Sequence, residues 1–214
     1  MNILAFTSRF PLFFSIVILI FLLGHNMRRA DKANRKKREE FFAKEAAANN
    51  TRKRSLDSVD YIVIPYNELP MDLECEDEIV RDCIKQVNEL KGEQIVNLTG
   101  ITNTDLKLEY GAPNITHLTK CDNLYTILSR TLQEWANRLH ELGHDDEALT
   151  ILEFAIKTRS DISASYYLAA RIYSERGDEK KIAWLKRSAE TVNSMMSGPI
   201  LRTLNEKYPD ISAY

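Results

Sequence analysis

The chain begins with its most apolar stretch. Fourteen uncharged residues, FPLFFSIVILIFLL at positions 10–23, precede Gly24. A helix of this length reaches only about 21 Å, whereas the apolar core of a bilayer is about 30 Å thick. Residues 3–8 supply the missing length if Arg9 reaches back to the headgroups. The pattern therefore predicts a transmembrane helix within residues 1–25, with membrane contact through residues 3–23. A cleaved signal peptide is the alternative, but no small-x-small cleavage site follows.

A strongly basic segment comes next. Residues 28–38, RRADKANRKKR, carry seven Lys or Arg and one Asp. Because such segments stay on the cytoplasmic side, we expect a single-pass protein of the cell membrane, with its N-terminus outside and its body in the cytoplasm. The same segment would attract anionic lipid headgroups. Residues 26–57 together are polar and predict an exposed, partly helical stalk.

Beyond the stalk, apolar positions recur every three or four residues, which is the pattern of amphipathic helices. It predicts helices at residues 76–91, 102–111, 145–158 and 199–209, and a long helix that Asp122 caps. Thr102 would cap the second of these, and Gly111 and Gly143 would end helices. The fold class is therefore all-α. We expect an extended segment and capping helices in residues 58–121, and helical hairpins in residues 122–214.

Two short apolar runs do not follow the helical pattern. They are YIVIP at residues 61–65 and QIVNL at residues 94–98. They can pair as a minor β pair, or lie separately along a helical core. The sequence leaves both arrangements open.

A 34-residue repeat lies within the helical part. Shifted by 34 positions, Ser129, Ala136, Glu141, Gly143 and Ala155 coincide with the same residue types at 163, 170, 175, 177 and 189. Small residues suit a close helix contact, and glycine suits the turn between two helices. Over about residues 129–196 these hairpins resemble the tetratricopeptide repeat.

A broader resemblance covers most of the chain. The anchor, the basic stalk, the block IVNLTGITNTDLKLEYGAPN and the hairpins occur in this order. In this respect the chain is similar to a family of small membrane-anchored proteins of Gram-positive bacteria. That similarity implies the architecture and adds no mechanism.

The hairpins also predict two details of packing. Trp135 should be buried between the helices of the first hairpin. Met195 and Met196 should fill the contact with the C-terminal helix, as core residues.

Residues 140–144 spell His-Glu-Leu-Gly-His, the H-E-x-x-H pattern of zinc metalloproteases. In such a protease both histidines lie one turn apart on a continuous helix and bind one metal ion. Here Gly143 stands where the repeat ends its helix, and no third histidine follows. The sequence therefore predicts no metal site, and neither a catalytic residue nor a cofactor motif is recognised.

The distribution of charge along the chain and the three cysteines limit the classes of protein to which the chain can belong. Residues 1–60 hold twelve Lys or Arg and six Asp or Glu, whereas residues 61–214 hold seventeen and twenty-five. An acidic body argues against a nucleic-acid-binding domain. In a reducing cytoplasm, Cys75, Cys83 and Cys121 would be free thiols.

These observations favour a non-enzymatic, membrane-tethered adaptor that binds a protein or peptide on a groove lined by the first helix of each hairpin. An enzyme with an unrecognised site and a purely structural membrane-associated subunit are the alternatives. In proteins with the repeat that this region resembles, groove positions are those not used in packing. They correspond here to Arg130, Gln133, Asn137, His140, Glu141, Tyr167, Arg171, Ser174 and Glu175.

Overall fold

The computed structural model describes residues 10–209, and every regular element among them is a helix. The all-α prediction is therefore confirmed for this part of the chain. The elements are α2 (Phe10–Asn49), α3 (Glu78–Glu89), α4 (Asn103–Tyr110), the 3-10 turn η1 (Ala112–Asn114), α5 (Ile115–Glu141), α6 (Asp145–Lys157), α7 (Ser163–Glu175), α8 (Glu179–Glu190) and α9 (Ser197–Lys207).

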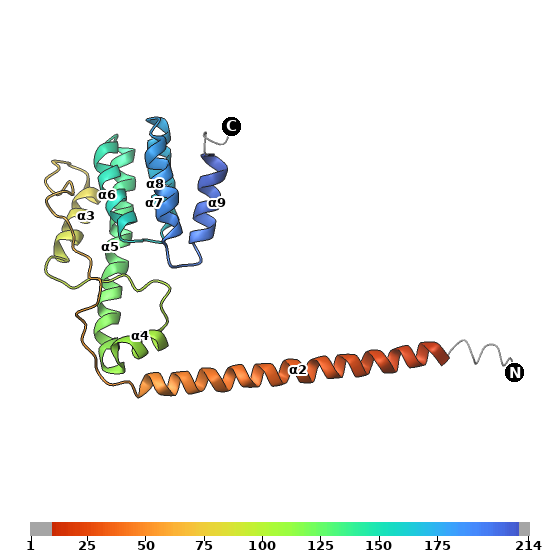
Figure 1. The fold of residues 1–214 in the computed structure, drawn as a ribbon. Coiled ribbons are helices and arrows are strands. Elements are labelled where there is room, and N and C mark those ends of the chain that lie inside the picture. Colours follow the sequence, from red (N-terminus) through yellow and green to blue (C-terminus); the bar gives the residue numbers. More distant parts are fainter. Residues whose placement is uncertain (1–9, 210–214) are drawn as a thin grey trace.

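Two helical hairpins form the centre of the body. Helices α5 and α6 make the first, α7 and α8 the second, and α3 and α9 flank them on either side (Figure 1). Each hairpin turns at a glycine with positive φ, +84° at Gly143 and +67° at Gly177, a conformation that glycine adopts without steric cost. Trp135 is completely buried in the common core, as the periodicity predicts.

The predicted caps have different outcomes. Thr102 caps α4, since its side chain accepts a hydrogen bond from the Asp105 amide at 3.2 Å. Asp122 does not cap α5, because that helix already begins at Ile115. The Asp122 carboxylate instead accepts a hydrogen bond from the Leu98 amide at 3.0 Å. The prediction was therefore wrong: Asp122 ties a loop to the middle of α5 and does not cap the helix.

The two apolar runs form no strands. A single backbone hydrogen bond joins them, from the Ile62 amide to the Ile95 carbonyl at 2.8 Å. Ile64 and Ile95 pack into the main core. Val96 and Leu98 belong to a second, smaller core next to α4 and the start of α5. These segments therefore line a helical core rather than form a sheet.

Helix α2 projects away from the body, and only its last turns contact it (Figure 1). Lys44 pairs with Asp105 of α4 at 2.6 Å, and Glu45 pairs with Lys107 of α4 at 2.8 Å. Ala48 is completely buried in this contact. The predicted stalk is therefore one continuous helix up to Asn49, and its C-terminal end is fixed to the body.

The predicted transmembrane helix is wrong for the described chain. Among residues 10–209, no helix combines the length and the apolar character needed to cross a bilayer. The uncharged run reaches only about 21 Å, and α2 continues from it directly into the basic segment. Residues 3–8 and Arg9, which the prediction needed to reach about 30 Å, lie outside the described residues.

The expectation for the two methionines is also wrong. Met195 is 94% exposed and Met196 is 38% exposed. The connection before α9 turns outward there, with the Met196 amide bonded to the Ser194 hydroxyl at 3.0 Å. Val192 occupies the core at this end of the second hairpin instead.

Candidate functional site

A shallow depression of about 510 Å³ lies on the predicted face of α5. Positions 130, 133, 134, 137, 138 and 141 share this face because they recur every three or four residues along a helix. Helix α3 forms one wall, and the connection between α6 and α7 forms the other. The structure brings four of the nine predicted groove residues together here: Arg130, Gln133, Asn137 and Glu141.

Two isoleucines provide the apolar part of the depression. Ile79 comes from the first turn of α3 and is 41% exposed, and Ile162 stands just before α7. Arg130 lies on the rim, is exposed, and forms no ion pair within residues 10–209. The depression therefore has apolar walls, and two exposed charged residues of α5 line it, Arg130 and Glu134.

Gln133 is a connecting residue rather than a contact residue. Its side chain is buried; its Nε2 donates to Asn137 Oδ1 at 2.9 Å, and its Oε1 accepts from the hydroxyl of the buried Ser165 on α7. This chain of hydrogen bonds joins the two hairpins just below the rim. Because Asn137 uses its oxygen here, its Nδ2 remains to donate to a ligand.

Arg138 was missed by sequence reasoning, although it shapes the depression. It donates to Asp77 through Nε at 3.0 Å and Nη2 at 2.6 Å, and to Glu141 through Nη1 at 2.7 Å. Asp77 also caps α3, accepting from the Val80 amide at 3.2 Å. The hydrogen bonds from Arg138 lower the pKa of Asp77. Arg138 thus fixes the α3 wall and neutralises Glu141. No local sequence pattern could have predicted its contact with Asp77, because the two residues are 61 positions apart.

The other predicted groove residues lie outside the depression. His140 Nδ1 contacts Asp145 Oδ1 at 2.6 Å, so this side chain spans the hairpin turn. The hydroxyl of the half-buried Tyr167 donates to Thr203 Oγ1 of α9 at 3.2 Å. The three remaining residues are exposed along α7: Arg171, Ser174 and Glu175. Because α9 packs against α7, the predicted stripe is not one continuous groove.

The structure separates the two histidines of the His-Glu-Leu-Gly-His pattern. His140 belongs to the last turn of α5, whereas His144 immediately precedes α6, beyond the Gly143 turn. Within the described chain, no group of three or more His, Cys, Asp or Glu side chains is placed to hold a metal ion. The two imidazoles therefore do not share the helical face that a zinc protease requires.

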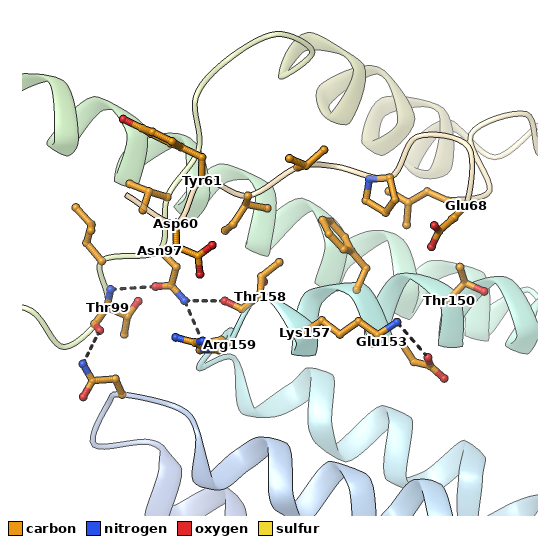
Figure 2. A pocket seen from close by; sticks show the side chains of 18 of the residues that line it. Asp60, Tyr61, Glu68, Asn97, Thr99, Thr150, Glu153, Lys157, Thr158 and Arg159 are labelled. Atoms are coloured by element: carbon orange, nitrogen blue, oxygen red, sulfur yellow. Dashed lines mark hydrogen bonds and ion pairs between the residues drawn. The ribbon is translucent and has the colours of Figure 1, made fainter. Parts of the chain in front are cut away.

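A larger cleft of about 910 Å³ lies on another side of the body (Figure 2). It separates the irregular residues 58–69 from α6 and ends at the turn after α6. There Asn97 Nδ2 donates to the carbonyls of Thr158 at 2.9 Å and Arg159 at 3.1 Å. Asn97 Oδ1 accepts from the Thr99 amide at 2.9 Å. Sequence reasoning missed this cleft because irregular segments, which have no periodicity, form one of its walls.

The most enclosed acid of the cleft is held in its ionised form. Burial raises the pKa of Glu153, but hydrogen bonds from Lys181 and Tyr173 outweigh burial, so the pKa lies below its usual range. Burial and the bond to Glu153 both raise the pKa of Tyr173. Asp146 pairs with Arg176 at 2.5 Å. These charged groups join α6 to α7 and α8. Because Glu153 is ionised, it cannot act as a general acid at neutral pH.

No protein-family model, curated protein or solved structure matches the chain.

Proposed function

We propose that the protein is a membrane-associated adaptor that binds an extended peptide segment of a partner in the depression on α5. The observation that carries this proposal is the unpaired Arg130, which shares one face of α5 with Asn137 in a depression with apolar walls. The resemblance of the hairpins to tetratricopeptide repeats supports it, because such repeats present the first helix of each hairpin to their ligands.

The chemistry of the depression favours one class of ligand. The Arg130 guanidinium would bind a carboxylate with two parallel hydrogen bonds. Asn137 Nδ2 would donate to a backbone carbonyl of the peptide. Ile79 and Ile162 would cover one aliphatic side chain. The expected ligand is therefore an extended segment in which Asp or Glu stands close to Leu, Ile or Val.

The proposed place of action is the cytoplasmic face of a bacterial cell membrane. The exposed basic residues of α2 support this location, since cytoplasmic leaflets carry anionic lipids. The proposal requires contact with the membrane surface only. The fixed joint between α2 and α4 would hold the depression at a set position relative to the basic segment.

An immobilised array of random nine-residue peptides tests the binding site. Wild-type protein should select acidic-aliphatic sequences, and Arg130→Glu should weaken binding about tenfold or more, because a hydrogen bond to a charged group contributes about 1.5–3 kcal/mol. Arg171→Glu is the matched control, since it reverses an exposed arginine on α7 outside the depression. Both variants should melt at the wild-type temperature.

Two results would contradict the proposal. One is equal binding by wild type and Arg130→Glu, and the other is an equal loss in both variants. A structural subunit, the alternative function, would select no peptide from the array at all.

A further inference from the structure

Helix α2 exposes eight consecutive large apolar side chains. Residues 16–23, IVILIFLL, are between 45% and 73% exposed, and they lie on the part of α2 that projects furthest from the body (Figure 1). A contiguous apolar surface of this kind marks a site of contact with another apolar phase or molecule.

After four intervening residues of the same helix, the surface becomes strongly basic. The seven cations of residues 28–38 are all exposed, and Asp31 is the one acid among them. Arg35 and Lys36 pair with Glu39 and Glu40, each at 3.7 Å and with mostly exposed side chains. Such exposed pairs contribute little, so most of the positive charge is available to a partner.

We infer that residues 16–38 of α2 bind the surface of a lipid bilayer that carries anionic headgroups. A bilayer offers both features in the required order, an apolar boundary for residues 16–23 and a layer of negative charge for residues 28–38. A nucleic acid would neutralise the cations and leave the apolar side chains uncovered. A second copy in parallel would bring the two basic segments together, where like charges repel.

This inference concerns contact with a bilayer surface, and crossing of the bilayer is not part of it. It specifies the membrane component of the proposed function and rests on that component alone. Peptide binding in the depression involves α3, α5 and the start of α7, so the two activities can fail separately.

Sedimentation with vesicles tests the inference on the full chain. The protein should pellet with vesicles of phosphatidylcholine mixed with phosphatidylglycerol at least tenfold more strongly than with phosphatidylcholine alone. Raising salt from about 0.1 M to about 1 M should remove this preference, because the Debye length falls from about 10 Å to about 3 Å.

Charge reversal locates the contact. Lys32→Glu, Lys37→Glu and Arg38→Glu together should weaken binding to the mixed vesicles at least tenfold. The matched control reverses three exposed cations of the body: Lys180→Glu, Arg187→Glu and Lys207→Glu. This control should bind mixed vesicles like the wild type.

Substitutions among residues 16–23 separate the apolar contribution to vesicle binding from the electrostatic contribution. Ile18→Ser and Phe21→Ser should weaken binding to both kinds of vesicle and leave the dependence on salt. Arg130→Glu should bind vesicles normally, which distinguishes a failure of this inference from a failure of peptide binding.

Four outcomes would overturn the inference. They are absence of vesicle binding, equal binding to neutral and anionic vesicles, tighter binding to a DNA duplex than to mixed vesicles, and self-association through α2 that excludes vesicles.

Discussion

Trp135 is the residue whose replacement should reveal most about the core. It is completely buried, yet its indole Nε1 has no hydrogen-bond partner within residues 10–209. Trp135→Ala should therefore cost about 3–5 kcal/mol of unfolding free energy, as for other large core aromatics. Trp135→Phe should cost clearly less, because it removes a buried donor that is unsatisfied. Denaturant unfolding of both variants measures this, and equal losses would contradict it.

The three cysteines should react at different rates. Burial raises the pKa of the Cys83 thiol to about 12 and also raises that of Cys121, and both side chains are almost fully buried. Cys75 is partly exposed. Since the thiolate is the reactive form, one thiol per chain should react quickly with a thiol reagent at neutral pH, and the others only on unfolding. Fast reaction of two or three thiols in the folded protein would contradict the packing around α3 and α5.

Residues whose roles are local could be predicted from the sequence, and those with distant partners could not. The Thr102 cap and the Gly143 turn depend on neighbours within one helical turn, and both are confirmed. Arg138 finds its partner Asp77 from 61 positions away, through the packing of α3 on α5. Asp122 was assigned to its own helix end, but a loop amide 24 positions earlier uses its carboxylate.

At the scale of elements, the joint between α2 and α4 depends on one close approach of the backbone. Gly111 has φ +91°, and a Cβ atom there would lie 2.2 Å from the Arg52 carbonyl oxygen. The segment after α2 is fixed at this point, where the Ala112 amide donates to the Thr51 carbonyl at 3.2 Å. Any side chain at position 111 must push this segment away from α4.

A comparison of two glycine substitutions tests the joint between α2 and α4. Gly143→Ala meets positive φ but no atom within 4 Å, so it should cost about 1–2 kcal/mol. Gly111→Ala adds a steric clash and should cost about 1–3 kcal/mol more. The distribution of distances between spin labels at Arg29 and Lys180, measured by pulsed EPR, should broaden only in Gly111→Ala. Equal costs, or an unchanged distance distribution in that variant, would contradict the fixed joint.

Helices with a clear period were the elements that the sequence could predict. The expected range 145–158 agrees with α6 to within one residue, and 199–209 overlaps α9. The two apolar runs were ambiguous, because an isolated extended segment buries alternate side chains whether it pairs or lies on helices. The transmembrane prediction required residues 3–8 for its length, and the described helix alone does not meet that requirement.

At the scale of the whole molecule, only half of the candidate site followed from the pattern. The repeat period placed Arg130, Asn137 and Glu141 on one face, and the structure gathers them in one depression. Helix α9 interrupts the second half of the predicted stripe. Its contact with Tyr167 depends on tertiary packing, which the repeat period does not predict. The cleft beside residues 58–69 arises in the same way, from irregular segments that only the complete fold brings together.

Four ionised carboxylates connect helices that are distant in the sequence. They are Asp77 between α3 and α5, Glu153 between α6, α7 and α8, and Glu45 and Asp105 between α2 and α4. Burial raises the pKa of each of them, most of all at Glu153, but hydrogen bonds from neighbouring side chains outweigh burial and lower all four. Each of these contacts is therefore strongest while its carboxylate is deprotonated.

The lowered pKa values set the direction of a pH dependence. A carboxylate whose folded pKa is lowered stabilises the fold above its unfolded pKa, about 3.9 for Asp and 4.3 for Glu, and this contribution is lost as pH falls towards the folded pKa. The melting temperature should thus be nearly constant from pH 7 to about pH 5 and fall below about pH 4. Asp77→Asn with Glu153→Gln should melt lower at pH 7 and lose less on acidification, whereas Asp72→Asn, which changes an exposed acid outside these joints, should follow the wild type. A double variant that loses as much melting temperature on acidification as the wild type would show that these two joints do not carry the acid sensitivity of the fold.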